Sequence, residues 1–262
     1  MMLLAALLFQ VGASFSPPPG ASLRVETEMR DGDTRRYRLE RLVRFTREGP
    51  GWQAEVILLR AEGDARDASA GMFQAGFAAF SGQPIRFHLD AEGHVTEVEA
   101  RSLLWERFCS RVAQFAAERR SLAPKDRSRL AERIAAPLRA LPAERQRGIL
   151  ASLVEAIIER DVPGAGSETV HLPGASPFGG TATLDGTRSV TRAADGAQIV
   201  HTLASAEVPA PGGSGNAQLT LEREVRSDPA TGLIEHSTST TRTLVSGVPS
   251  VRIVTIIVHR SD

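Results

Sequence analysis

The sequence predicts an α+β fold: a curved antiparallel β-sheet, half-barrel-like, packed on a central insertion of three helices. Two observations carry this prediction. A strand–turn–strand unit occurs on both sides of the middle of the chain, at 85–98 and at 219–237. Between the two units, apolar residues recur with the period of helices instead of strands. The 262 residues are 42% hydrophobic, enough for one large domain with a real core.

Each strand–turn–strand unit reverses through an aspartate and a glycine. The first turns through Asp90 and Gly93, and the second turns through Asp228 and Gly232. An aspartate side chain accepts hydrogen bonds from the backbone of a turn, and glycine tolerates positive φ. Side chains alternate in the flanking strands, so we expect one covered face and two flanks of a single sheet.

Three further strands are expected before the first unit, at 23–29, 37–45 and 52–59, joined by turns at 31–33 and 48–51. A short helix is expected between 68 and 80, because Met72, Phe73, Ala75, Phe77 and Phe80 fall at helical spacing. This helix should cover one end or face of the sheet.

The helical middle of the chain is expected to contain three helices. Ser102 can cap the first, a second runs from near Asp126 to Leu138, and Pro142 opens the third, which ends before Pro163. Each carries an apolar stripe typical of packing against a sheet or a neighbouring helix.

The last hundred residues return to strands. Gly, Pro and Ser dominate 164–180, which predicts a loop, and strands are expected at 181–184, 187–191 and 198–208 with turns at Asp185-Gly186 and Asp195-Gly196. The stretch 251–259 is apolar enough for a strand covered on most of both faces. We expect it inside the sheet.

The N-terminus predicts export. An apolar run at 1–11, too short to span a bilayer, precedes small residues at Val11 and Ala13 that could mark cleavage. Residues 1–20 are therefore interpreted as a signal peptide and a flexible mature N-terminus, with a buried N-terminal helix as the alternative. The rest, 21–262, is expected to be one domain: 21–100, the helical insertion 101–163, and 164–262. A periplasmic or otherwise exported location follows.

Charge is balanced overall but unevenly placed. Between Arg101 and Arg160 there are 13 Lys and Arg against 7 Asp and Glu, a local charge of +6, which leaves 18 against 24 elsewhere. The helices and the sheet could neutralise one another, or the basic helices could face anionic lipid or a partner. Nothing in the totals predicts a nucleic-acid partner.

No pattern predicts catalysis, a metal or a cofactor. Six histidines are scattered, and only His88 and His94 are near each other in sequence. No Gly-x-Ser-x-Gly elbow is present, and Cys109, the single cysteine, lies in a helical apolar pattern that predicts a buried thiol. Acidic residues of the strands, Glu26, Glu28, Glu97 and Glu99, are interpreted as a solvated sheet face. We therefore predict a non-enzymatic protein.

The motif Phe-x-Leu-Asp-x-x-Gly-x-Val at 87–95 and the motif Asp-x-x-Thr-Gly-Leu-Ile at 228–234 flank the helical block. In this arrangement the chain resembles uncharacterised exported bacterial proteins. In architecture alone it is similar to the half-barrel of the lipoprotein carriers of the bacterial envelope, the LolA and LolB type. That resemblance implies a concave apolar face that shelters acyl chains, with helices as a lid.

The leading hypothesis is therefore an envelope protein that binds a lipid-like or lipoprotein ligand or an envelope partner. Seven aromatic residues could line its cleft: Trp52, Phe73, Phe77, Phe80, Phe87, Trp105 and Phe108. The first alternative is a structural or interaction module that docks on a membrane or protein through its basic helical region. A hydrolase with a diffuse site is the third hypothesis. A pocket beside the aromatic helices would favour the first, and helices that fill the concavity would favour the second.

Overall fold

One antiparallel sheet organises the protein. The computed structural model describes residues 15–32, 35–63, 68–118, 124–159, 166–210 and 215–261. The order of strands across the sheet is β5-β4-β3-β2-β1-β11-β10-β9-β8-β7-β6. The strands are β1 (Ser22–Asp31), β2 (Arg35–Glu48), β3 (Gly51–Gly63), β4 (Pro84–Leu89), β5 (Val95–Val98), β6 (Gly166–Ala175), β7 (Thr181–Arg192), β8 (Gln198–Pro209), β9 (Asn216–Asp228), β10 (Leu233–Val245) and β11 (Val248–Ser261).

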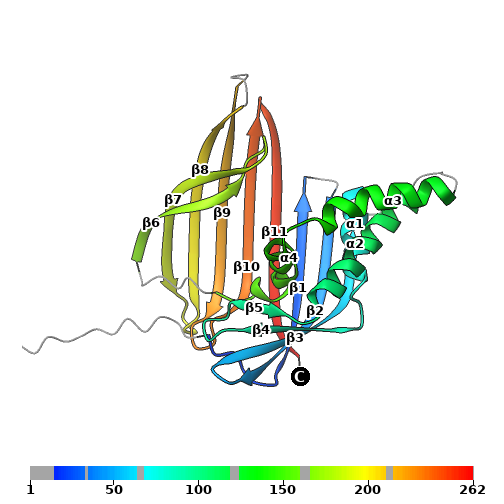
Figure 1. Cartoon of the computed structure of the whole chain (residues 1–262). Helices are drawn as coiled ribbons and strands as arrows, with labels where there is room; N and C mark the ends of the chain where they lie inside the picture. Colours follow the sequence, from blue (N-terminus) through cyan, green and yellow to red (C-terminus); the bar gives the residue numbers. More distant parts are fainter. Residues whose placement is uncertain are drawn as a thin grey trace, which may run out of the picture.

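In the described ranges, four helices accompany the sheet: α1 (Ala68–Ala78), α2 (Arg101–Glu118), α3 (Pro124–Arg139) and α4 (Ala143–Glu155). The α+β prediction is confirmed, and the helical insertion holds the three helices expected of it. Figure 1 shows a curved sheet with the helices gathered in front of one end and the β6–β7 hairpin crossing in front of β8 and β9. None of the helices in the described ranges is long and apolar enough to cross a membrane.

The two strand–turn–strand units are β4–β5 and β9–β10, in opposite halves of the same sheet. Asp90 Oδ1 accepts hydrogen bonds from the backbone of Glu92 and His94, and Asp228 Oδ1 accepts one from Ala230. Gly93 and Gly232 have φ of 86° and 69°, the left-handed conformation that the turns require. The prediction of two flanks of one sheet is confirmed. The expectation that the helices cover both flanks is wrong, because among the described elements they make extensive contacts with β5 but not with β9 or β10.

The N- and C-terminal halves are joined by pairing of β1 with β11, from Ser22↔Ser261 to Asp31↔Arg252. β11 thus lies inside the sheet, as predicted. Its central residues, 253–258, are partly buried on both faces and none is fully buried, which fits the prediction of a strand covered on most of both faces.

The main core lies between the helices and β1–β5. Val25, Phe45, Phe87 and Leu150 are among its fully buried members. α1 packs on β2 and β3, α4 packs on β3 and β5, and α2 packs on α1. Among the described elements, no helix makes an extensive contact with β6–β9. The helices therefore cover one half of the sheet and not the other.

A buried arginine ties α4 to the sheet. Arg41 Nε donates to the Leu153 carbonyl at 2.7 Å, and its Nη1 donates to Thr27 Oγ1 at 2.9 Å. Leu153 lies in the last turn of α4, where helix carbonyls lack intrahelical partners. Complete burial lowers the pKa of Arg41 to about 10, so the group remains charged at neutral pH.

Two predictions for the C-terminal half are wrong. The stretch 164–180, predicted as a loop, contains β6, which pairs with β7 from Gly166↔Val190 to Ala175↔Thr181. β6 is an edge strand, where Gly and Pro are tolerated, so composition alone misled the prediction. Asp185-Gly186, predicted as a turn, lies inside the continuous strand β7. The Asp195-Gly196 turn is confirmed by the hydrogen bond from Ala193 N to the Ala197 carbonyl.

The predicted signal peptide at 1–13 lies outside the described residues. The stretch 16–20, which we expected to be flexible, is hydrogen-bonded to the fold: Ser16 N donates to the Thr231 carbonyl and Gly20 N to the Phe45 carbonyl. Just before it, Phe15 is buried and its ring packs edge-on against Phe45, with centroids 5.5 Å apart.

Candidate ligand-binding site

The aromatic residues predicted to line a cleft lie in the main core. Trp52, Phe80, Phe87 and Trp105 are at most 3% exposed, and Phe77 is 8% exposed. Phe108 is partly buried against the same core, whereas the Phe73 side chain lies outside the described part of the structure.

These rings pack mainly on one another. Trp105 stacks on Phe108 with centroids 5.2 Å apart, and Phe108 meets Phe77 edge-on at 5.8 Å. Trp52 packs edge-on against Phe15 at 5.9 Å. None of the seven predicted residues lines any of four pockets that the described residues form. Their ligand-lining role stays a prediction.

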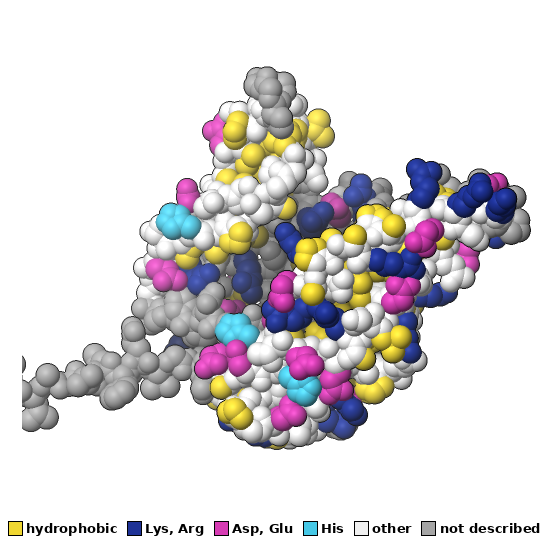
Figure 2. All heavy atoms as spheres, viewed as in Figure 1, with side chains coloured by type: hydrophobic (Ala, Val, Ile, Leu, Met, Phe, Trp, Pro, Cys, Tyr) yellow, Lys and Arg dark blue, Asp and Glu magenta, His cyan; other side chains and the backbone are white. Residues whose placement is uncertain are grey.

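A cavity of about 410 Å³ lies on the other half of the sheet. The tip of the β6–β7 hairpin, at Pro173–Pro177, stands opposite β10 and β11, and the cavity lies between them. In Figure 2 the surface is hollowed between the lobe formed by β6–β9 and the helical lobe. The lining residues are Asp31, Pro173, Gly174, Ala175, Ser176, Pro177, Leu184, Leu219, Leu221, Thr241, Thr243, Ser250 and Arg252.

Strand register explains why these side chains meet. One transverse row runs from Leu221 on β9 through Thr241 on β10 to Arg252 on β11, which pairs with Asp31 on β1. Directly paired residues of antiparallel strands share a face, so all four point to the same side of the sheet.

The next row runs from Leu219 through Thr243 to Ser250. Both rows therefore change in the same order across the strands, from an apolar side chain through a hydroxyl to a polar or charged group. The site is amphipathic because neighbouring strands differ in composition.

The apolar wall of the cavity belongs to a small second core. Leu184 and Leu219 are each 2% exposed, and Phe178 at the hairpin tip is partly buried with them. Gly174 lets the hairpin close tightly, because a Cβ there would lie 2.1 Å from Leu184 Cδ1. The hairpin thus covers this part of the sheet as the helices cover the other part.

Charged side chains mark the polar side of the cavity. Arg252 Nη2 lies 3.2 Å from Asp31 Oδ2, and Arg35 Nη1 lies 3.3 Å from the same oxygen. In the adjacent row of the same face, Arg188 and Arg223 flank Thr202, but these residues lie outside the lining of the cavity. A polar ligand group would therefore meet guanidinium and carboxylate groups here.

A smaller pocket of about 300 Å³ lies at β1 and β11. Ile253 and Ile257 contribute apolar atoms, but Glu26 and Glu28 are held there by Arg38 and Arg36 at 2.8 and 2.9 Å. The prediction of a solvated acidic sheet face fits these half-exposed ion pairs. This pocket is lined by paired charges, whereas the cavity at β9–β11 has an apolar wall.

The histidines lie apart in the described structure. His94 Nδ1 lies 3.1 Å from Asp90 and His171 Nδ1 lies 2.6 Å from Asp185, each an exposed one-to-one contact. No group of three or more His, Cys, Asp or Glu residues that could hold a metal ion occurs among the residues that the structure describes. Cys109 is buried, as predicted, and burial raises the pKa of its thiol.

The fold and cavity define an α+β protein with an open, curved antiparallel sheet and an amphipathic cavity on one half of it. No protein-family model matches the chain, and no curated protein matches it. A solved structure that reports lipid–protein interactions in lipovitellin is similar over 94% of this chain, with 10% sequence identity and a TM-score of 0.45. The match spans about a quarter, 25%, of the lipovitellin chain.

Proposed function

We propose that the protein is a non-enzymatic binder of a lipid-like ligand, and that the ligand lies in the cavity between the β6–β7 hairpin and β9–β11. The observation that carries the proposal is the cavity itself. Its volume of about 410 Å³ is within the range of roughly 300–1,000 Å³ typical of small-molecule sites. Its apolar wall and polar opposite side fit an amphipathic molecule.

The ligand's orientation follows from the lining. An acyl chain would lie against Leu184, Leu219 and Leu221, where each methylene removed from water contributes about 0.8 kcal/mol. A polar group would face Thr241 and Arg252 on the opposite side. Because these hydroxyl and guanidinium groups donate hydrogen bonds, an oxygen-rich polar group is the better match.

This arrangement changes the role of the helices. The resemblance to lipoprotein carriers implies helices that act as a lid over the ligand. Here the helices pack on β1–β5, and the β6–β7 hairpin stands over the proposed site instead. Access to the cavity would then depend on movement of the hairpin rather than of the helices.

A substitution that fills the cavity tests the proposal. Thr241→Trp places a bulky ring in the middle of the Leu221–Thr241–Arg252 row, and Thr240→Trp is the matched control, because successive strand residues face opposite sides. We expect wild type and Thr240→Trp to bind a fluorescent fatty acid alike, and Thr241→Trp to lose at least about ten-fold in affinity, about 1.4 kcal/mol.

Native mass spectrometry of the purified wild-type protein supplies a second readout, with lipid extraction to identify what co-purifies. A wild-type protein that carries no lipid and does not bind the fatty acid would contradict the proposal. Equal affinity of wild type and Thr241→Trp would contradict the location. Unfolding midpoints of the two variants show whether either has lost its fold.

We also propose that the protein is exported, as the apolar run at 1–11 and the small residues at Val11 and Ala13 indicate. In a bacterial envelope the ligand would then be a membrane lipid or the acyl group of a lipoprotein. Cell fractionation tests this location directly, and recovery of the protein in the cytosol would contradict it.

A further inference from the structure

α3 stands out from the body of the protein. It packs extensively on α2 and on no other described element. In Figure 1 it extends beyond the sheet and the other helices, and in Figure 2 Lys and Arg side chains gather along it. The helix is therefore accessible over most of its surface. The proposed ligand cavity lies on the other half of the molecule.

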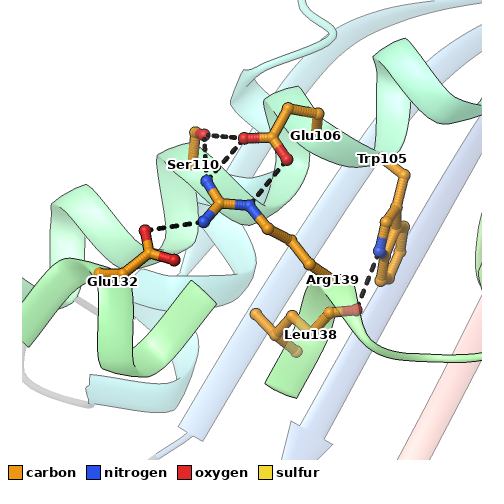
Figure 3. Close-up of polar contacts among 6 residues, drawn as sticks. All are labelled: Trp105, Glu106, Ser110, Glu132, Leu138 and Arg139. Atoms are coloured by element: carbon orange, nitrogen blue, oxygen red, sulfur yellow. Dashed lines mark hydrogen bonds and ion pairs between the residues drawn. The ribbon is translucent and has the colours of Figure 1, made fainter. Parts of the chain in front are cut away.

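The C-terminal end of α3 is fixed to α2 by polar contacts (Figure 3). Arg139 donates from Nε and Nη2 to the two carboxylate oxygens of Glu106 at 2.7 and 2.6 Å, and from Nη1 to Glu132 at 2.9 Å. Trp105 Nε1 donates to the Leu138 carbonyl at 3.0 Å. These contacts hold α3 in one orientation and pair Glu132 with a positive charge.

The Arg139 guanidinium lowers the pKa of the Glu106 carboxyl. Because this pKa is lowered, the Glu106–Arg139 ion pair stabilises the attachment of α3 above the ordinary carboxyl pKa, and this contribution is lost as pH falls through the lowered value. At neutral pH the Glu106–Arg139 ion pair therefore makes its full contribution to holding α3 on α2.

Three basic residues form one row along the outer side of α3. Lys125, Arg129 and Arg133 are four residues apart, so they lie one above another on the helix. All three are exposed, and none makes an ion pair or hydrogen bond with the described residues. Like charges at this spacing repel one another, so the row is unfavourable for the helix alone.

The remaining charges of α3 do not cancel this row. Arg127 adds a further positive charge, and Asp126 in the first turn offsets one. Because Glu132 is paired with Arg139, the outer side of the helix keeps a net positive charge. A negatively charged surface brought against it would relieve the repulsion within the row.

We infer that the outer face of α3 docks on an anionic lipid bilayer. An acidic protein is the weaker match, because protein interfaces centre on apolar and aromatic side chains and the row has none. A bilayer surface instead attracts each basic side chain separately through its surface potential. This inference rests on α3 alone and does not require the cavity to bind lipid.

Vesicle binding tests the docking surface. The full chain is sedimented with vesicles of phosphatidylcholine and with vesicles that contain about one-third phosphatidylglycerol. We expect binding to the anionic vesicles alone, weakened by added salt because the contact is electrostatic. Arg129→Glu with Arg133→Glu should lower the partition coefficient at least about 25-fold, at roughly five-fold per charge removed.

The matched control changes two other exposed arginines, Arg192→Glu with Arg260→Glu, which alters the net charge equally and lies outside the helices. We expect this control to keep most of the vesicle binding. Equal loss in both double variants would show that only net charge matters and would overturn the inference. Unchanged binding of the α3 variant, binding to neutral vesicles, or no binding to either vesicle would also overturn it.

Discussion

His88 illustrates how single residues hold the first half of the sheet together. Its Nδ1 lies 2.7 Å from Glu48 Oε2, at the end of β2, and its Nε2 lies 3.2 Å from Glu99 Oε1, just after β5. The hydrogen bond with Glu48, followed by the charges of Glu48, Glu99 and Glu97, raises the pKa of His88. The residue joins three segments only when it is protonated.

This arrangement predicts a pH-dependent contribution to stability. Because the folded-state pKa is raised, the contribution is complete below the ordinary histidine value and is lost as pH rises through the raised value. We expect His88→Gln to lower the free energy of unfolding more at pH 5.5 than at pH 8.5, measured by urea denaturation. Glu48→Gln is the control and should bring the pKa of His88 back toward its ordinary value in an NMR titration. An equal effect of His88→Gln at both pH values would contradict the assignment.

Residue patterns predicted burial better than they predicted the site. Phe77, Phe80 and Trp105 were identified from their helical spacing, and all three are buried. The cavity residues Thr241 and Thr243 gave no such signal, because they belong to a run of Ser and Thr without apolar alternation. What makes them a site is pairing with Leu221 and Leu219 on one side and with β11 on the other. Long-range register of this kind is invisible in a single sequence.

Among the elements, the β6–β7 hairpin departs most from the sequence-based expectation. Asp185-Gly186 has the composition of a tight turn, and turn propensity is a local property. Gly186 instead pairs with Val170 and Ala204 in the middle of β7. A Cβ there would lie 2.0 Å from the Leu203 carbonyl oxygen and 2.5 Å from Ala204 Cα, so the glycine permits a close approach of two backbones. Ladder pairing on both sides outweighs the local preference.

Gly186→Ala should therefore destabilise the protein by about 1–3 kcal/mol, because the backbone of β8 must move to make room. Gly148→Ala in α4 is the matched control. Its added methyl group meets nothing within 4 Å, and alanine should stabilise the helix by about 0.5–1 kcal/mol. Urea denaturation measures both. A neutral Gly186→Ala would show that β7 and β8 are not so closely packed in solution.

On the scale of the whole molecule, the sheet has two unlike halves joined by β1 and β11. The sequence predicted a single sheet and a helical insertion, because periodicity of two and of 3.6 residues survives in the local pattern. It could not predict which strands the helices would cover, since that depends on the order β1-β11-β10 across the centre of the sheet. The half of the sheet that the helices leave uncovered, and the cavity on it, follow from this strand order.

Photo-crosslinking with a diazirine-labelled fatty acid tests most directly whether the half of the sheet left open by the helices holds the ligand. We expect adducts on peptides of β7, β9 and β10, around Leu184, Leu221 and Thr241, with a lower yield in Thr241→Trp. Adducts concentrated on α1 and α2, around Phe77 and Trp105, would place the ligand among the aromatic residues of the main core and contradict the proposed site.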